Sequence, residues 1–325
     1  IEDTVHVPIS MPGKKEIELL MHLEDKLHDR IIAQQDAVST IAEAMRRVRS
    51  GIITSQKPIS FLFLGPTGVG KTETTKALAD LYYGGEHNMI RLDMSEYNGE
   101  IGVRRLLGAP PGEGQERGEL TDKIHDAPAS LVLLDEFEKA HPKILDLFLQ
   151  VFDDGRLTDN KGVTVSFRDA IIIATSNAGS EFIREEVEKG TAIDKKFQAK
   201  LLDYLQANKM FKPELLNRFD GIVTFRPLGE LDVKQVVGLL LKKIKENLLK
   251  QDILITFDDA VIEKISQEGS NKEFGARPLN RYIQDNIEDL IAKNKLTGNV
   301  TRGKSINIGI DGTNNINLTI STNTC

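Results

Sequence analysis

The sequence predicts an α/β fold, in which a large domain has a parallel sheet covered by helices and a smaller, mainly helical domain with short strands follows. Short apolar runs alternate with helical patterns as far as Pro227, which is typical of a parallel sheet with helices on its faces. Beyond Pro227 this alternation stops. A chain of 325 residues with 40% hydrophobic content can bury a core in each of two domains. We therefore expect a linker from an upstream module over residues 1–14, a large domain over 15–226 and a small domain over 227–325.

Composition argues against several classes of protein. The net charge of −7 and the pI near 5.5 oppose a general nucleic-acid or membrane-surface binder. No apolar run reaches the roughly 18 residues of a membrane span. The single cysteine, Cys325, cannot form an intrachain disulfide, which favours a reducing compartment. Since the chain starts at Ile1 without a signal or transit pattern, we expect a cytoplasmic excerpt of a longer protein with no membrane or nucleic-acid partner.

Apolar periodicity places the elements in chain order. Apolar residues recur at helical spacing from Ile17 to Met45 and predict two amphipathic helices with a break near Asp29 to Gln35. The strands predicted for the large domain are 61–64, 89–93, 130–134 and 170–175. The elements predicted for the small domain are helices over 231–250, 259–267 and 277–296, and strands over 305–310 and 315–320.

A glycine-rich turn between the first strand and a helix over 71–81 fills every fixed position of a phosphate loop. Its backbone N–H groups must turn inward around phosphate oxygens, which a Cβ at the glycines would obstruct. Lys71 would reach the β- and γ-phosphates of ATP, and the Thr72 hydroxyl would meet Mg²⁺. A chance glycine-rich turn is the alternative, and the strand before and helix after it argue against that. The residues predicted to bind the nucleotide here are Gly65, Pro66, Thr67, Gly68, Val69, Gly70, Lys71 and Thr72.

Polar residues follow the third and fourth predicted strands, at the edge of the sheet where functional groups collect. Asp135 can hold Mg²⁺, and Glu136 can orient the water that attacks the γ-phosphate. Carboxylates at a strand end are also common as solvated turn residues, but their place some sixty residues after a phosphate loop favours the functional interpretation. Asn177 could bond the γ-phosphate or the water, or it could simply turn the chain before Gly179.

Two later arginines could meet phosphate, Arg218 and Arg277. A single arginine is more often a solvated surface group or a salt-bridge partner. Spacing alone does not assign either of them a role.

Together these residues resemble the second nucleotide-binding module of the Clp ATPases, such as ClpB, ClpC and ClpA, in the AAA+ superfamily. The resemblance covers roughly residues 15 to 310 and implies a P-loop NTPase fold. The motifs that carry it are FLFLGPTGVGKTE at 61–73, LDMSEY at 92–97, LGAPPG at 107–112, LVLLDEFEKAHP at 131–142, LQVFDDGRLTD at 149–159, TSN at 175–177, FKPELLNR at 211–218 and GARPL at 275–279.

The resemblance implies a role for each matching residue. Lys71 and Thr72 would be the Walker A pair, Asp135 and Glu136 the Walker B pair, and Asn177 the first sensor. Arg218 would be the arginine finger that reaches a neighbouring subunit, and Arg277 the second sensor. The family works as a hexameric ring that threads protein substrates, so hydrolysis is expected to depend on assembly. A finger acting in trans is worth about 10³ to 10⁵ in rate.

The sequence departs from the family pattern in two places. These ATPases usually carry an aromatic pore loop resembling GYVGYEEGG, whereas residues 113–119 read EGQERGE without any aromatic. A charged, glycine-rich loop grips a passing chain less well than an aromatic one, although the hairpin-like stretch 155–167 could compensate. Protease-feeding members also display an Ile/Leu-Gly-Phe/Leu tripeptide, and residues 179–210 contain none, so we do not expect protease docking through that element.

Two functional hypotheses follow. The first is an ATP-hydrolysing module of a protein unfoldase or disaggregase chaperone. The alternative is a nucleotide-gated assembly or partner-binding module without processive threading, which the missing aromatic motivates. A nucleic-acid motor is a weaker third, because no basic-aromatic stripe is present.

Overall fold

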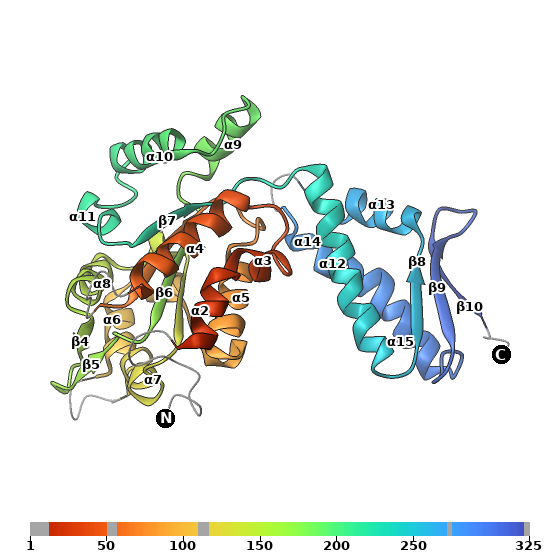
Figure 1. The fold of residues 1–325 in the computed structure, drawn as a ribbon, viewed down its shortest axis with the longest axis horizontal. Helices are drawn as coiled ribbons and strands as arrows, with labels where there is room; N and C mark the ends of the chain where they lie inside the picture. The colour runs from red at the N-terminus through yellow and green to blue at the C-terminus, as the bar shows by residue number, and fades with distance from the viewer. Residues whose placement is uncertain (1–12, 51–56, 110–116, 272–274, 322–325) are drawn as a thin grey trace. The chain divides into compact units, whose positions relative to one another are not determined.

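The computed structural model describes residues 13–50, 57–109, 117–271 and 275–321 (Figure 1). Internal contacts divide the chain into two units. Unit 1 runs as far as Arg226 except for Pro66–Val69, and unit 2 comprises Pro66–Val69 and the chain from Pro227 onward. The predicted linker lies outside the described residues over 1–12.

Unit 1 begins with three helices, α2 (Lys14–Met21), α3 (Leu23–His28) and α4 (Gln35–Arg49). The predicted break before α4 is present, because Ala33 and Gln34 have φ angles of 58° and 61°, which no α-helix accommodates. The helix predicted ahead of that break is not continuous. His22, at φ −112° and ψ 20°, leaves helical geometry and separates α2 from α3.

The core of unit 1 is a five-stranded parallel sheet in the order β2-β3-β6-β1-β7. Its strands are β1 (Ile59–Leu64), β2 (Met89–Asp93), β3 (Leu131–Asp135), β6 (Ile171–Ser176) and β7 (Gly221–Thr224). The four predicted strands are confirmed within two residues at each end. Strand β7 was not predicted, because it has only four residues and begins with a glycine.

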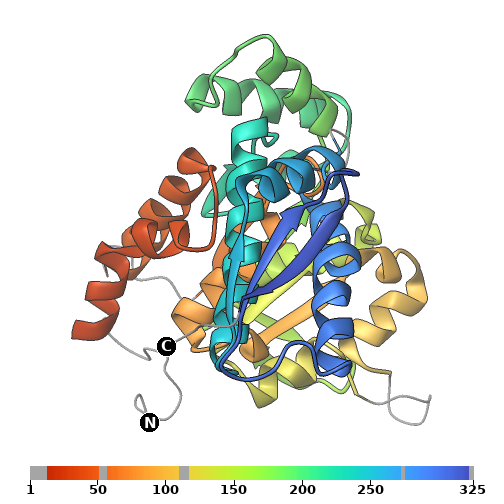
Figure 2. The ribbon, with the colours of Figure 1, turned by 90° about the vertical axis from the view of Figure 1, so that its right-hand side faces the viewer.

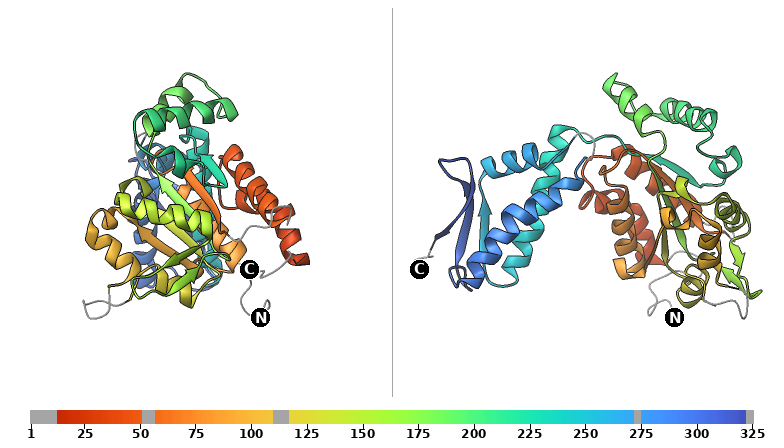
Figure 3. Two further views of the ribbon diagram at one scale, coloured as in Figure 1. Left: turned by 90° about the vertical axis from the view of Figure 1, so that its left-hand side faces the viewer. Right: turned by 180° about the vertical axis from the view of Figure 1, so that it is seen from behind.

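Helices lie on both sides of this sheet (Figure 3). One apolar cluster joins alternate strand residues such as Leu62 and Ile172 to Phe148 and Phe152 of α8. The other elements of unit 1 are α5 (Lys71–Tyr83), η1 (Glu86–Asn88), η2 (Met94–Tyr97), α6 (Glu100–Leu107), α7 (Thr121–Asp126), η3 (Phe137–Lys139), α8 (Pro142–Asp154), β4 (Arg156–Thr158), β5 (Thr164–Ser166), α9 (Ser180–Glu188), α10 (Lys195–Ala207) and α11 (Pro213–Leu216). Strands β4 and β5 pair antiparallel, so the predicted hairpin is confirmed.

Unit 2 packs helices against a small sheet with the strand order β10-β9-β8 (Figure 2). Strand β9 pairs antiparallel with β10 and parallel with β8, and the sequence analysis missed the four-residue β8. The predicted helix over 277–296 contains a five-residue π-helical turn. The elements are α12 (Glu230–Leu249), β8 (Leu254–Phe257), α13 (Asp259–Glu268), α14 (Arg277–Ile283), η4 (Gln284–Glu288), α15 (Asp289–Leu296), β9 (Ser305–Ile310) and β10 (Ile316–Ser321).

Among the described residues, no helix has both the length and the apolar character needed to cross a membrane.

Candidate nucleotide site

The glycine-rich turn joins the end of β1 to the start of α5. A Cβ at Gly65 would lie 2.6 Å from the carbonyl oxygen of Phe225, so the chain can pass there only as glycine. Gly70 takes a left-handed conformation, at φ 110°, and the described residues show no side-chain cap at this end of α5. The N-terminus of a helix that follows a glycine-rich turn is suited to binding a phosphate through its first N–H groups.

Lys71 opens α5, and its side chain is buried, with 9% exposed. Its ammonium donates hydrogen bonds to the Gly65 carbonyl and, at 2.8 Å, to Oδ1 of Asn177. Burial lowers the pKa of Lys71 to about 8, against the attraction of neighbouring carboxylates, of which Glu138 acts most strongly. The ammonium thus stays cationic at neutral pH and is held beside the tip of β6.

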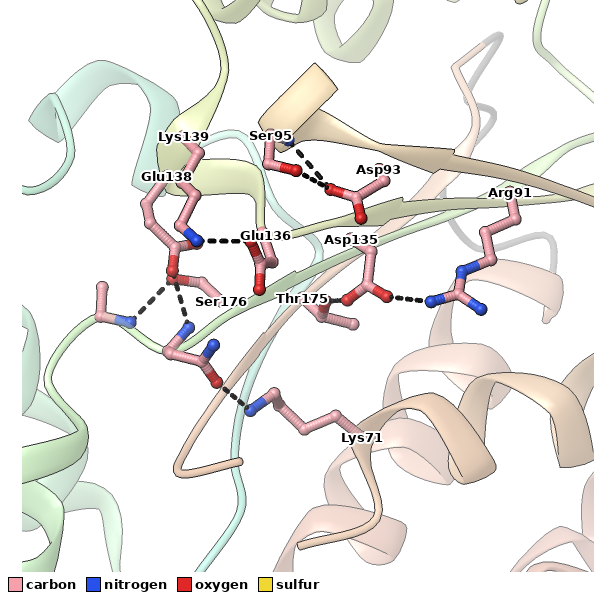
Figure 4. A network of polar contacts seen from close by, with 12 residues as sticks. Lys71, Arg91, Asp93, Ser95, Asp135, Glu136, Glu138, Lys139, Thr175 and Ser176 are labelled. Carbon is pink, nitrogen blue, oxygen red and sulfur yellow. Dashed lines mark hydrogen bonds and ion pairs between the residues drawn. The ribbon is translucent and has the colours of Figure 1, made fainter. Parts of the chain in front are cut away.

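Asp135 ends β3, where parallel pairing with β6 brings it next to the Thr175 side chain (Figure 4). Oδ1 of Asp135 accepts a hydrogen bond from the Thr175 hydroxyl, and Oδ2 accepts one of 2.8 Å from the Arg91 guanidinium. Arg91 is not among the predicted site residues, and its signal in the sequence is a charged residue at the centre of the predicted strand 89–93.

Glu136 follows at once in a left-handed conformation, with φ 55°. Oε2 of its side chain accepts a hydrogen bond of 2.6 Å from Lys139. The carboxylate remains one-third exposed, so water can reach it. The two adjacent carboxylates therefore differ in environment, since the Asp135 side chain is 17% exposed and bonded to Thr175 and Arg91, whereas the Glu136 side chain is 33% exposed and bonded to Lys139.

Asn177 lies one residue beyond β6 and is held at both ends. Its backbone N–H donates to Oε1 of Glu138 at 3.0 Å, while its side-chain oxygen accepts from Lys71. The three bonded residues come from α5, from the segment after β3 and from the end of β6, and Figure 4 shows Lys71, Glu138 and Ser176 of these segments. Sequence reasoning did not select Glu138, whose signal was a third carboxylate just after the Asp135–Glu136 pair.

The described residues are compatible with ATP and Mg²⁺. No group of three or more His, Cys, Asp or Glu side chains in the described ranges could hold a metal by itself. Magnesium at nucleotide sites usually binds one or two protein oxygens and completes its shell with phosphate and water. The Thr72 hydroxyl and the Asp135 carboxylate are oxygen donors of that kind, so they remain the predicted magnesium residues.

The two predicted arginines lie outside this hydrogen-bonded group. Arg218 follows α11, is 47% exposed and forms an ion pair of 2.7 Å with Asp153 of α8. Arg277 is the exposed first residue of α14 in unit 2. Of the predicted pore loop, residues 113–116 lie outside the described residues. The roles of both arginines and of that loop stay predictions.

Comparison with known proteins places both units in one family. The AAA domain family (Cdc48 subfamily) matches residues 56–222, and the C-terminal, D2-small domain of ClpB protein matches residues 228–308. A chaperone protein ClpB from Oceanobacillus iheyensis is 44% identical over 314 residues, which are 94% of this chain and 39% of the relative.

Two further matches agree. The negative regulator of genetic competence ClpC/MecB from Bacillus subtilis is 42% identical over 327 residues, which are 98% of this chain and 40% of that protein. A closed-state cryo-EM reconstruction of Hsp104 with ATPγS and FITC casein superposes with a TM-score of 0.84 at 33% identity, covering 98% of this chain and 54% of that one.

The chain spans about two-fifths of the length of the curated relatives described here. The matches run through both of its units, and the phosphate loop and strand-end carboxylates lie within the AAA domain match. The chain belongs to the Clp ATPase family of the AAA+ superfamily.

Proposed function

We propose that this chain is the ATP-hydrolysing module of a Clp-type protein unfoldase or disaggregase that works as a hexameric ring. The observation that carries the proposal is the convergence of Lys71, Asp135, Glu136 and Asn177 at one edge of the parallel sheet. These are a phosphate-binding cation, a metal-binding carboxylate, a solvent-facing carboxylate and an amide. Groups of these kinds bind phosphate, hold Mg²⁺ and position the attacking water in NTP-hydrolysing sites.

Each residue has a distinct task in this proposal. Lys71 and the first N–H groups of α5 bind the phosphates, and Thr72 and Asp135 hold Mg²⁺. The ion, when bound, neutralises phosphate charge. Glu136 orients and polarises the attacking water, because Lys139 engages only its Oε2. Asn177 then contacts the γ-phosphate or that water from beside Lys71.

The arginines act at the level of the ring. Arg218 is half-exposed and can turn to a neighbouring subunit, exchanging Asp153 for a phosphate. Arg277 would sense the nucleotide within its own chain from the start of α14. A finger acting in trans is worth about 10³ to 10⁵ in rate, so turnover is expected to require assembly.

The expected partners are other copies of the chain and protein substrates. The relatives include a chaperone, which favours remodelling over an assembly module without threading. We also still predict a cytoplasmic location. The predictions that the chain docks no protease and binds neither membranes nor nucleic acid likewise stay predictions.

Substitution of the proposed base tests this function. In the assembled protein, Glu136→Gln is expected to lower ATP turnover by about 10² to 10⁴-fold, because the amide cannot accept a proton from water. The affinity for a fluorescent ATP analogue is expected to stay within about threefold, since Glu136 is not among the predicted phosphate-binding groups. The matched control is Glu181→Gln, an exposed carboxylate in the first turn of α9, which is expected to change neither quantity. Undiminished hydrolysis by Glu136→Gln would refute the assignment of the base.

Coupling to protein remodelling needs a separate measurement. The intact assembly with unaltered Glu136 is expected to unfold a labelled protein only while ATP is supplied, and the Glu136→Gln assembly is expected to bind that protein without processing it. If ATP is hydrolysed normally but no substrate is unfolded under any condition, the ATPase assignment stands and the remodelling function is wrong.

A further inference from the structure

Glu138 is the third carboxylate after β3, and its two oxygens have very different surroundings. Oε1 accepts the backbone N–H of Asn177 at 3.0 Å. Oε2 is buried and has no hydrogen-bond partner among the described residues. An unsatisfied buried carboxylate oxygen is costly, so the burial of Glu138 calls for an explanation.

The backbone of Glu138 is fixed by its neighbours. The 3₁₀ turn η3 is closed by a hydrogen bond of 2.9 Å from the Lys139 N–H to the Glu136 carbonyl. Phe137, which is completely buried, packs edge-on against Phe148. This anchor leaves the Glu138 side chain little freedom, and its carboxylate is presented to the end of β6 from a rigid base.

The hydrogen bonds continue beyond Glu138. The backbone N–H of Asn177 donates to Glu138, and the side-chain oxygen of the same residue accepts a hydrogen bond of 2.8 Å from the Lys71 ammonium. A continuous chain of contacts therefore links the segment after β3, the tip of β6 and the start of α5. Asn177 is the middle residue of this chain of contacts. Glu138 holds the Asn177 backbone, from which the Asn177 side-chain amide extends toward Lys71.

The geometry points to Glu138 as a positioning residue, which fixes the Asn177 backbone so that the Asn177 amide is delivered beside Lys71 at the phosphate site. This inference rests on the proposed function. Glu138 itself contacts no reacting group, and its effect on turnover passes through Asn177. The Glu138 carboxylate also attracts the Lys71 ammonium electrostatically, although no hydrogen bond joins the two groups among the described residues.

Three substitutions separate the acceptor from the charge. Glu138→Gln keeps an acceptor at the same reach and removes the charge. Glu138→Asp keeps the charge but withdraws the acceptor by one methylene, and Glu138→Ala removes both. If Glu138 acts by positioning Asn177, the Glu138→Gln variant behaves like the wild type, and the Glu138→Asp and Glu138→Ala variants behave like each other.

The direct readout is hydrogen exchange of the Asn177 backbone N–H in the nucleotide-free full chain. Glu138→Ala and Glu138→Asp are expected to speed this exchange by about 10-fold or more, because both take the acceptor away from the Asn177 backbone N–H. Glu138→Gln is expected to stay within about threefold of the wild type. In the assembled protein, Ala and Asp should lower kcat by about 10-fold with little change in KM, since substrate binding does not use this bond.

A matched control removes a carboxylate with the same kind of bond elsewhere. Asp194 caps α10 by accepting the backbone N–H groups of Lys196 and Phe197, each at 2.9 Å. Asp194→Ala is expected to speed exchange at those two amides and to leave kcat unchanged.

Two results would overturn the inference. One is an Asn177 amide whose exchange is unchanged in Glu138→Ala, and the other is a Glu138→Gln variant that loses as much kcat as Glu138→Ala while melting like the wild type. If the wild-type assembly hydrolyses no ATP, the proposed function fails, and the exchange experiment still decides whether Glu138 holds Asn177.

Discussion

Lys71 is the residue at which burial and function conflict most directly. Its side chain is buried, and its ammonium donates hydrogen bonds to the Gly65 carbonyl oxygen and to the Asn177 side-chain oxygen. Desolvation therefore lowers its pKa to about 8, from an unfolded value of about 10.4. A phosphate would place negative charge beside this buried ammonium and so offset part of its desolvation.

This conflict predicts a pH dependence of the nucleotide-free chain. Between the folded and unfolded pKa values of Lys71, the unfolded state binds more protons, so the free energy of unfolding contributed by this group rises with pH. Relative to Lys71→Met, the wild type is expected to gain stability from pH 8 to pH 10 in denaturant titrations. Lys143→Met, at a lysine with 63% of its side chain exposed, is the control and should show no such trend. A constant difference between the wild type and Lys71→Met would contradict the burial argument.

Asp252 carries backbone strain that a glycine would relieve. It follows α12 at φ 61°, and its side chain is exposed. Left-handed geometry is unfavourable for any residue with a Cβ, although Asp tolerates it better than Ala. We expect Asp252→Gly to raise the free energy of unfolding by about 0.5 kcal/mol and Asp252→Ala to lower it by a similar amount. Thermal melting of the two variants in parallel checks the order, and a Gly variant less stable than the Ala variant would contradict it.

At the scale of elements, a polar contact joins three helices of unit 1. Glu16 of α2 is 9% exposed, and its carboxylate accepts hydrogen bonds from Arg49 of α4, at 2.7 Å, and from the Tyr82 hydroxyl of α5. Burial raises the pKa of Tyr82, which keeps the phenol protonated as a donor. A single carboxylate thus satisfies groups from two other helices, one of which begins at Lys71 of the phosphate loop.

Removal of that carboxylate is expected to be costly. Glu16→Ala should lower the free energy of unfolding by roughly 2–3 kcal/mol, because it leaves the Arg49 charge and the Tyr82 hydroxyl poorly compensated. The matched control is Glu24→Ala, which breaks a pair with Arg46 in which both side chains are about one-third exposed, and its cost should be below about 1 kcal/mol. Denaturant titration of both variants decides the point, and equal losses would contradict the role given to burial.

Periodicity predicted the elements whose burial is extensive. Strands β3 and β6 read as continuous apolar runs because both faces of a parallel sheet are covered, and each was placed within one residue at either end. Strands β7 and β8 have four residues each, which is too short for a pattern to stand out from its surroundings.

The site could be predicted only where its residues have a fixed spacing along the chain. The phosphate loop and the Asp135–Glu136 pair are local motifs, so the sequence displays them. The contacts of Arg91 with Asp135, and of the Gln34 amide with the Arg226 backbone 192 positions away, depend on tertiary pairing. No local pattern encodes such contacts, and the role of Glu138 could be inferred only after the fold brought it to Asn177.

At the scale of the whole molecule, the proposed machine extends beyond one chain. The chain covers about two-fifths of the length of its curated relatives, and a ring would need several copies. Arg218 depends most directly on this assembly, because its proposed role is to contact the nucleotide bound by a neighbouring subunit. In the single chain its guanidinium is paired with Asp153, a contact that it must give up to act there.

The most direct test is therefore the ATPase rate measured against protein concentration, with Arg218→Ala chains mixed in at increasing fractions. Arg156→Ala, at another exposed arginine that pairs with a carboxylate, is the control for dilution by an altered chain. If the active site is shared between subunits, the rate per wild-type chain rises with concentration and Arg218→Ala depresses it, whereas Arg156→Ala does not. A rate per chain that is independent of concentration and insensitive to Arg218→Ala would contradict a shared active site, and with it the proposed ring.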